Sequence, residues 1–460
     1  MPARNRVVVV DVVGLTPALL AHMPRLRALG ADGFQAPLGT VLPAVTCSVQ
    51  STFLTGRPPR DHGIVGNGWY FRELSEIWLW RQSNRLVGGE KVWDAARRLL
   101  GDVRTANLFW WYAMGSTADL AVTPRPVYWA DGRKSPGIYA HPAAVGGELT
   151  RRFGEFPLFD FWGPRAGLPS SAWIAEAARW VFDDQRPDLT LVYLPHLDYD
   201  LQRFGGASPE AARAAAEIDT VAGALVEHVR SAGATAVVLS EYGITDVRRP
   251  VHVNRRLREA GLLEVTWNPA GELLDTFASP AFAVADHQVA HVYVTDRRAL
   301  AAARDALTGL PGVAEILDDQ GKRAHGLDHP RAGDLVLVAE PDAWFTYYYW
   351  LDEARAPDFA PTVEIHRKPG YDPAELLFDG GAAKARAAMR LAQKALGFRY
   401  SLDVIPLHGD GVRGSHGRLP ARDDDGPVLL CSDRGAARDR LAATDVFGLI
   451  LDLLGAEGRR

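Results

Sequence analysis

Cysteine is scarce in this sequence: the 460 residues include only Cys47 and Cys431. Two thiols so far apart in sequence form neither a disulfide framework nor a zinc knuckle, and this usage is typical of a reducing compartment. The sequence also lacks a signal-peptide pattern at its N-terminus and any apolar run of the roughly 20 residues that a membrane-spanning helix needs. We therefore expect a cytoplasmic protein that does not use a membrane as a partner.

A large excess of charge of one sign is absent as well. The formal net charge of -5 gives no general attraction for nucleic acid, which we do not expect as a partner. The hydrophobic fraction of 47% and the charged fraction of 23% are typical of soluble globular proteins, so a large core can form without metals or disulfides. The length allows one elaborated domain or two.

Short β-branched runs recur along the chain, each followed by a loop and a helix-like segment. The clearest runs span residues 7–10, 189–194 and 236–239, and the Ala-rich segments 171–182 and 209–231 have the composition of covering helices. Fully apolar runs suit strands that are buried on both faces, as in a parallel sheet. The order of these segments predicts an α/β fold with a mostly parallel central sheet flanked by helices.

Composition divides the chain into three parts. Residues 1–263 contain the alternating strands and helices of the predicted core, with an aromatic-rich insertion at about 67–150. Residues 264–354 contain alternating apolar segments, which predict a smaller α+β insertion or cap. Residues 355–460 are rich in Gly, Pro, His and Arg as far as Gly417 and are expected to return to the core.

Two polar residues follow apolar segments in positions that suit catalysis. Asp11 ends the first valine-rich strand, and open α/β sheets build their sites at the carboxyl ends of such strands, although an Asp there is often only a turn residue. Thr46 stands at a predicted helix start, where a hydroxyl is often a structural cap. The free amides of a helix N-terminus also attract anions, so a phosphoryl group could be held against the Thr46 hydroxyl.

The order of these motifs resembles the alkaline phosphatase superfamily, and within it the nucleotide pyrophosphatase/phosphodiesterase group. Members share a strand-end Asp, a nucleophilic Thr before a helix, a Thr-Gly, then Pro and His-Gly-Ile-Val. Here Asp11, Thr46, Thr55-Gly56, Pro59 and the run 62–65 occupy those places in order. The resemblance implies an alkaline-phosphatase-like fold and a metal-dependent phosphoesterase.

The resemblance also implies roles for residues further along the chain. Asn67 matches the family's phosphate-binding Asn, and His416, in a Gly-Ser-His-Gly segment, matches its last metal-binding His. The implied metal ligands fall into two groups: Asp11, Thr46, Glu241 and Tyr242 for one ion, and Asp198, Gln202 and His416 for the other. Up to two divalent ions are therefore expected.

Three of these positions depart from the family pattern. Gln202 and Tyr242 stand where histidines are expected, and Glu241 replaces an Asp. A ligand set dominated by oxygen favours Mn²⁺, Mg²⁺ or Ca²⁺ over a tight pair of zinc ions. A missing imidazole could come from another histidine, and the candidates without an assigned role are His196, His252, His366, His408 and the polar cluster of Asp286, His287, Gln288 and His291.

The resemblance implies in-line attack by Thr46 on phosphorus, a covalent intermediate and its hydrolysis by water, with a small phosphorylated metabolite or nucleotide-like substrate. Arg125, Lys134 and the neighbouring Arg133 could bind a second phosphate, or could lie in a solvated loop. Trp110 and Trp111 could form a wall for a substrate ring, or an ordinary aromatic core.

Two other functions stay open. The same site could hydrolyse a phosphonate or transfer a phosphoryl group, because residues outside the core motifs decide that choice. The loss of two histidine ligands also allows a degenerate protein that binds a phosphorylated metabolite without turnover. The oligomeric state is open.

Overall fold

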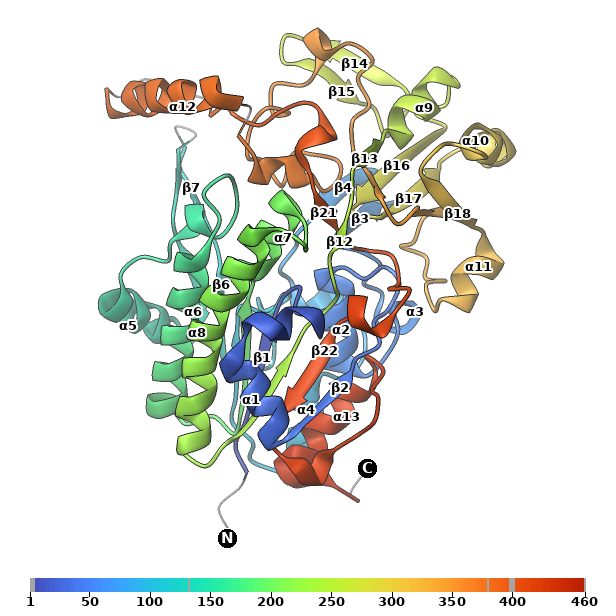
Figure 1. Ribbon diagram of the computed structural model, residues 1–460. Helices are drawn as coiled ribbons and strands as arrows, with labels where there is room; N and C mark the ends of the chain where they lie inside the picture. Colours follow the sequence, from blue (N-terminus) through green and yellow to red (C-terminus); the bar gives the residue numbers. More distant parts are fainter. Residues whose placement is uncertain (1–4, 131–132, 379, 397–401, 459–460) are drawn as a thin grey trace.

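The computed structural model describes residues 5–130, 133–378, 380–396 and 402–458. Its centre is an eight-stranded sheet (Figure 1). In spatial order the strands are β2 (Phe34–Pro37), β22 (Val428–Cys431), β11 (Thr235–Leu239), β1 (Val7–Val12), β10 (Leu189–Leu194), β5 (Thr105–Leu108), β6 (Leu120–Pro124) and β9 (Ile138–His141).

The five strands from β11 to β6 run parallel, and antiparallel strands lie at both edges of the sheet. All six residues of β1 and of β10 are buried, as expected for valine- and leucine-rich strands that are covered on both faces. The predicted α/β fold with a mostly parallel sheet is confirmed, and its three clearest strands are where the sequence placed them.

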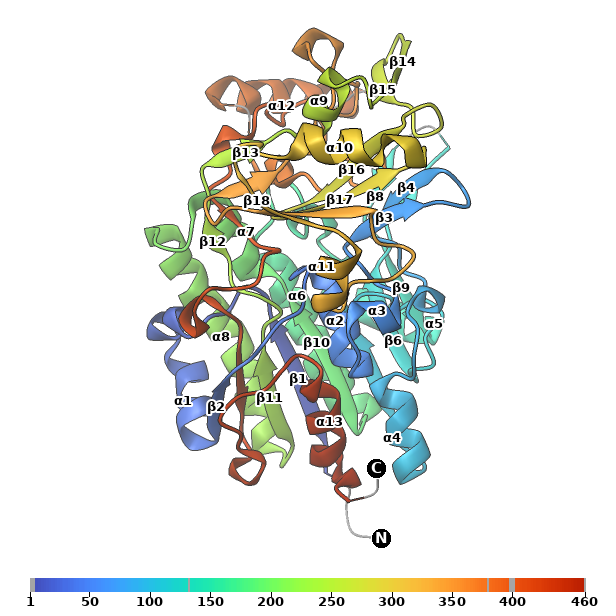
Figure 2. The ribbon, with the colours of Figure 1, turned by 90° about the vertical axis from the view of Figure 1, so that its right-hand side faces the viewer.

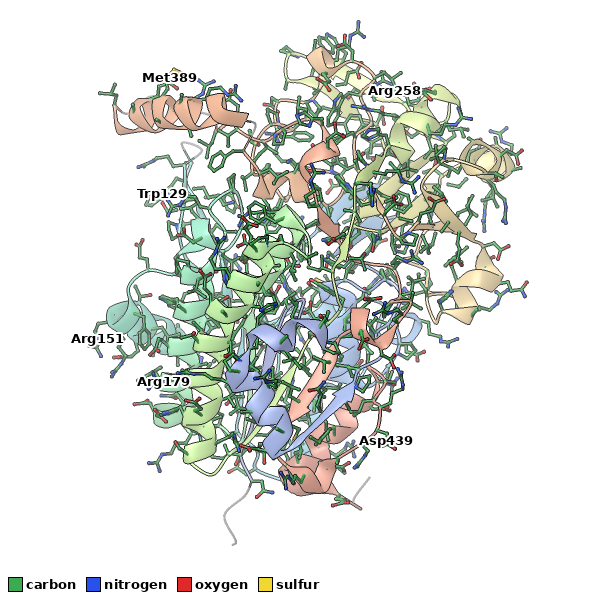
Figure 3. The ribbon with its side chains drawn as sticks, in the orientation of Figure 1. Trp129, Arg151, Arg179, Arg258, Met389 and Asp439 are labelled. Atoms are coloured by element: carbon green, nitrogen blue, oxygen red, sulfur yellow. The ribbon has the colours of Figure 1, made fainter. Side chains whose placement is uncertain are left out.

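Helices cover both faces of this sheet. Figure 2 shows the sheet between α1 and α8 on one side and α4 and α13 on the other, and side chains such as Arg151 extend outward from α5 (Figure 3). The helices of the core are α1 (Pro24–Asp32), α2 (Thr46–Thr55), α3 (Pro59–His62), α4 (Val92–Leu100), α5 (Ala143–Phe153), α6 (Leu168–Trp180), α7 (His196–Phe204), α8 (Pro209–Ser231) and α13 (Asp445–Leu451). No helix among the described residues is long and apolar enough to cross a membrane.

A second layer lies beyond the carboxyl ends of the parallel strands (Figures 1 and 2). It contains a four-stranded antiparallel sheet in the order β16 (Ala281–Asp286), β17 (Val289–Val294), β19 (Leu335–Ala339) and β18 (Val313–Leu317). Its helices are α9 (Val253–Glu259), α10 (Leu300–Leu307) and α11 (Asp319–Ala324), and α12 (Gly380–Ala395) follows later in the chain. Paired short strands complete the structure: β3 (Gly68–Phe71) with β4 (Glu76–Leu79), β7 (Val127–Tyr128) with β8 (Lys134–Ser135), β12 (Thr245–Asp246) with β21 (Gly414–Ser415), β13 (Arg249–Val251) with β20 (Ala343–Phe345), and β14 (Val265–Asn268) with β15 (Gly271–Leu274).

The second hydrophobic core extends beyond the segment 264–354 that the sequence marks as an insertion. It also includes Trp69 and Tyr70 from the aromatic-rich segment, Val251 and Leu257 before the insertion, and Phe359 after it. Segments from three parts of the chain thus bury their apolar side chains in one core with the antiparallel sheet. The three-part division of the chain therefore stays a prediction.

Candidate active site

The candidate site lies at the carboxyl ends of three adjacent parallel strands. Asp11 is the second-to-last residue of β1. Asp198 lies in the first turn of α7 just after β10, and Glu241 follows β11 by two residues. Because β1 pairs in parallel with both β10 and β11, the ends of all three strands meet at one edge of the sheet. All three carboxylates are buried.

Thr46 is the first residue of α2, and the preceding Val45 has an extended backbone conformation. The Thr46 hydroxyl lies 3.0 Å from the Tyr242 hydroxyl, and either can be the donor. Every residue of α2 is buried, so this helix start is held within the core and faces the site with a fixed orientation. Its position suits the binding of an anion, because the first amides of a helix have no partner within the helix.

Gln50 is a site residue that the sequence reasoning missed. Its amide nitrogen donates to Asp11 Oδ2 at 3.2 Å and to Glu241 Oε1 at 2.6 Å. Its amide oxygen accepts the Trp111 backbone N–H at 2.8 Å, which fixes the orientation of the amide. Gln50 follows Thr46 by four residues, and residues with that spacing share one face of a helix, so the sequence did hold a signal for it.

The three buried carboxyl groups resist ionisation. Burial raises the pKa of Asp11 to about 7, although hydrogen bonds with Glu241 and Gln50 lower it in part. Burial also raises the pKa of Asp198 to about 7. It raises the pKa of Glu241 well above its usual range, and the neighbouring Asp11 adds to that shift while hydrogen bonds from Thr46 and Gln50 oppose it. The group must therefore hold protons or a cation.

A second pair of residues joins Asp198 to the later part of the chain. The Gln202 amide nitrogen donates to Asp198 Oδ2 at 2.7 Å, and the Tyr371 hydroxyl donates to Gln202 Oε1 at 3.0 Å. Gln202 thus stands beside Asp198, one helical turn further along α7, as the resemblance implied. Tyr371 had no role in the sequence reasoning, because only the folded chain brings it there.

Four aromatic rings form a column along the site. Tyr242 stacks on His416 with ring centroids 3.6 Å apart, His416 lies 3.7 Å from His287, and His287 lies 3.7 Å from Tyr371. His416 Nδ1 donates to the Ala44 carbonyl oxygen at 2.8 Å, which leaves Nε2 unprotonated. His416 therefore lies against Tyr242 and His287, whereas the resemblance grouped it with Asp198.

His287 is the imidazole that the structure adds to the site. It lies in the two-residue turn between β16 and β17 with a φ of 60°, and such turns favour Gly or Asn over a bulky side chain. Its Nδ1 donates to Asp286 Oδ1 at 2.9 Å, and its buried Nε2 has no hydrogen-bond partner. A histidine at a hairpin turn that strains its backbone is a sign of function. In the sequence, only the polar cluster around Asp286 pointed to this residue.

Asn67 lies beside the helix start but is bound by other groups. Its side-chain oxygen accepts the Cys47 backbone N–H at 3.0 Å, and its amide nitrogen donates to Asp286 Oδ1 at 3.1 Å. Asn67 is therefore a link between α2 and the turn that carries His287. One N–H of its amide remains for a ligand.

The donors fit a divalent cation in their chemistry. Asp11 Oδ1, Asp198 Oδ1 and Glu241 Oε2 are buried oxygens without a hydrogen-bond partner, and hard cations prefer such ligands. Their arrangement is less complete: the described residues contain no group of three His, Cys, Asp or Glu side chains placed to hold a metal ion. The predicted ligands are thus close neighbours rather than a formed cage.

A cavity of about 2120 Å³ opens onto part of this group: Asp198 lines it, whereas Asp11 and Glu241 do not. Its buried inner end, the floor, is lined by Thr46, Asp198, Gln202, Tyr242, His287 and His416. Its outer part is lined by several cationic side chains, Arg81, Arg125, Arg133, Lys134, Arg165 and Arg367, together with His366. Arg125 and Lys134 are thus at the cavity, and their role as substrate contacts stays a prediction.

Trp110 differs from the expectation of a substrate contact. It is fully buried in the first hydrophobic core, where its ring lies 6.2 Å from Phe53, and it does not line the cavity. Its neighbour Trp111 does line the cavity and packs against Trp80 with ring centroids 4.8 Å apart. The irregular segment after β5 thus places one of these adjacent rings in the core and the other at the cavity.

The other candidate histidines lie elsewhere. His196 Nε2 pairs with Glu217 at 2.9 Å, and His252 Nδ1 bonds to the Thr346 hydroxyl at 2.8 Å. Neither lines the cavity, and His366 lies at its outer part. His196 and His252 thus bond to groups that do not line the cavity, and their use in place of the imidazoles missing at Gln202 and Tyr242 stays untested.

Comparison with known proteins gives matches of family and of fold. A family model described as type I phosphodiesterase / nucleotide pyrophosphatase matches residues 7–372. Phosphonoacetate hydrolase from Sinorhizobium meliloti, solved with phosphonoformate, has a TM-score of 0.62 and 16% identity over 98% of this chain and 96% of that one. Murine ectonucleotide pyrophosphatase/phosphodiesterase 5, solved as an inactive variant with AMP, has a TM-score of 0.58 and 14% identity over 98% of this chain and 95% of that one. A search of curated proteins finds no match.

Proposed function

Because the chain belongs to the type I phosphodiesterase / nucleotide pyrophosphatase family, a family of hydrolases, we propose that it hydrolyses a phosphoester or pyrophosphate bond of a small phosphorylated metabolite or nucleotide-like molecule. The family resemblance drawn from the sequence is confirmed. The observation that carries the proposal is the Thr46 hydroxyl, which opens a buried helix at the floor of the large cavity beside three buried carboxylates.

Thr46 acts as the nucleophile in this proposal. Its Oγ1 forms a bond to phosphorus while the bond to the leaving oxygen breaks, and water then cleaves the phospho-threonine intermediate. Burial and the neighbouring Asp11 hold the pKa of Glu241 high, so without a cation this carboxyl is protonated; in the ionised form that a bound cation would stabilise, it would accept the hydroxyl proton of Thr46. The Tyr242 hydroxyl, 3.0 Å from Oγ1, donates a hydrogen bond to the oxygens that gain charge.

Gln50 and Asn67 hold these groups in place. Gln50 ties Asp11 to Glu241 and is itself fixed by the Trp111 backbone. Asn67 contacts the second amide of α2 and keeps one N–H for a phosphoryl oxygen. The nucleophile therefore stands on a rigid helix whose surroundings are already oriented.

We further propose dependence on a divalent ion. When bound, such an ion lowers the pKa of the attacking hydroxyl and offsets the charge of the phosphoryl group. Asp11, Thr46, Glu241 and Tyr242 would hold it at one position, and Asp198, Gln202 and His416 at the other. The excess of oxygen donors supports Mn²⁺, Mg²⁺ or Ca²⁺ rather than a pair of zinc ions.

Turnover by metal-stripped protein tests the proposal. The substrates are bis(p-nitrophenyl) phosphate, p-nitrophenyl phosphate and phosphonoacetate, each after separate addition of Zn²⁺, Mn²⁺, Mg²⁺ or Ca²⁺. Thr46→Ala is expected to lower kcat at least about a thousandfold. Ser51→Ala is the matched control, because it removes a buried hydroxyl without a hydrogen-bond partner from the same helix.

The outcomes separate the alternatives. Release of nitrophenol that requires Thr46 supports the esterase, and the preferred ester separates a diesterase from a monoesterase. Cleavage of phosphonoacetate alone would assign a phosphonate hydrolase. Binding of phosphorylated ligands without turnover under every ion would contradict the proposal and assign a binding protein.

A further inference from the structure

The outer part of the cavity is lined by two cations, Arg81 and Lys134, and by the imidazole of His366. Arg81 follows β4, Lys134 lies in β8, and His366 lies in the loop before Lys368, and all three line the cavity. Burial lowers the pKa of His366, and the charges of Lys134 and Arg81 lower it further. We call Arg81, Lys134 and His366 the mouth cluster.

The cations of the mouth cluster lack the partners that neighbouring cations have. Arg165 and Arg367 also line the cavity, but they pair with Asp160 and Asp358, each at 3.0 Å. Among the described residues, neither Arg81 nor Lys134 has a carboxylate within ion-pair distance. Their contacts are with the faces of aromatic rings, Trp78 at 4.2 Å for Arg81 and Tyr128 at 5.7 Å for Lys134.

Aromatic rings connect this cluster with the floor. Trp80 lies between the two ends, with ring centroids 4.8 Å from Trp111 and 6.1 Å from Tyr371, and Tyr371 ends the ring column that begins at Tyr242. Trp162 adds a ring 5.5 Å from Tyr371. The path from Thr46 to Arg81 is therefore lined by flat apolar surfaces, and the volume of the cavity exceeds that of an ordinary small-ligand pocket.

We propose that the mouth cluster is a second anion-binding subsite, and that the substrate carries a phosphoryl group at one end, a flat or apolar body, and a second anionic group at the other. This inference rests on the proposed function for the phosphoryl end. Arg81 and Lys134 bind the far anion directly, because no carboxylate in the described part of the chain neutralises their charges and the rings partly withdraw them from water. The aromatic path binds the body by stacking.

Calorimetric binding to the full-length protein with a divalent ion present tests the subsite. The probes form two matched pairs that differ only in a terminal carboxylate: phenylphosphonate with 4-phosphonobenzoate, and biphenyl-4-phosphonate with 4'-phosphonobiphenyl-4-carboxylate. The carboxylate is expected to raise the affinity about tenfold in at least one pair. The double variant Arg81→Gln/Lys134→Gln is expected to remove that preference.

Arg165→Gln is the matched control, because Arg165 lines the same cavity but is neutralised by Asp160. It should keep the preference for the carboxylated probe. Retained binding of the plain probe by the double variant shows that this variant is folded. Equal binding of both members of each pair by the wild-type protein, or a preference that persists in the double variant, would overturn the subsite.

The readout does not depend on catalysis. If the protein proves to bind without turnover, the carboxylate preference and its loss in the double variant would still support the subsite while the proposed hydrolysis fails. If turnover is found and no preference exists, the subsite fails and the hydrolase stands.

Discussion

The floor and the mouth of one cavity differ in charge, in burial and in origin. At the floor, Asp198 lines the cavity and Glu241 lies behind it. Both are buried, and both follow parallel strands of the central sheet. At the mouth, Arg81 and Lys134 come from short hairpins outside that sheet. An anionic substrate is thus attracted at the entrance and meets carboxylates at the inner end, and that combination requires a cation or protons at the floor.

The floor and the mouth also differ in how firmly their side chains are held. Each floor residue is held by at least one neighbour, such as Gln202 for Asp198 and Ala44 for His416. The mouth residues are held by ring faces and by loops. Floor substitutions should therefore change the chemical step, whereas mouth substitutions should change substrate choice and capture.

The largest effect in this comparison is expected from Asp198→Asn, which removes a floor charge. We expect kcat to fall about 100-fold, because an amide is a poorer ligand for a divalent ion. The control is Asp200→Asn on the same helix, whose carboxylate pairs with Arg203 at 3.1 Å. Steady-state kinetics at a saturating ion concentration is the measurement, and equal losses in both variants would contradict the assignment.

The same variant tests the electrostatics of the floor in metal-free protein. Burial raises the pKa of Asp198 to about 7, so the folded chain binds a proton that the unfolded chain has released above about pH 4. Stability therefore falls as pH rises from about 4 to 7. The melting temperature of Asp198→Asn minus that of wild type should grow from pH 5 to pH 8 in chelator, and a difference that is independent of pH would refute this explanation.

Tyr242→Phe should lower kcat by about tenfold to a hundredfold, because it removes the hydroxyl that contacts Thr46 and keeps the ring on His416. KM should change little. Tyr193→Phe is the control, since Tyr193 lines the same cavity at the end of β10. If both variants lose the same activity, the Tyr242 hydroxyl has no special role at the floor.

Substitution of the two adjacent tryptophans distinguishes a core residue, Trp110, from a residue of the cavity wall, Trp111. Trp110→Phe should lower the free energy of unfolding by about 1–2 kcal/mol with little change in KM, because Trp110 packs only in the core. Trp111→Phe should raise KM about threefold for an aryl ester, since it reduces the stacking surface of the wall. Denaturant unfolding and steady-state kinetics measure the two effects. The reversed result, a raised KM for Trp110→Phe and a loss of stability for Trp111→Phe, would assign the substrate contact to Trp110 instead.

The smallest effect concerns capture at the mouth. For an anionic ester, kcat/KM should fall about twofold to threefold between 50 and 300 mM salt, because exposed charges are screened, while kcat stays constant. Arg81→Gln/Lys134→Gln should flatten this dependence. A salt effect on kcat rather than on kcat/KM would locate the sensitive charges at the floor instead.

Much of this arrangement could be predicted from the sequence because its signals are local. Apolar runs that suit a sheet buried on both faces predicted β1 and β10, and the ordered spacing from Asp11 to the run 62–65 predicted the family. The site roles of Asp11, Thr46, Asp198 and Glu241 stay predictions, although the fold does bring these side chains to one edge of the sheet. Gln50 could have been found from its helical spacing.

Other features have no local signal. Trp110 and Trp111 have the same side chain, and only the turn after β5 decides which one is buried in the core and which lines the cavity. His287 and Tyr371 belong to segments far from the early motifs and reach the site through the second layer. Their roles depend on contacts between segments that no spacing rule relates.

By itself, then, the sequence determined the α/β fold and the family and predicted the edge of the sheet where the candidate site lies, because periodicity and strand-end residues are local properties of the chain. Tertiary structure alone decided the ring column from Tyr242 to Tyr371, the amide of Gln50 between two carboxylates, and the cluster of Arg81, Lys134 and His366. The physical reason is that burial and charge at a site are sums over neighbours from distant segments, which exist only once the two layers have packed together.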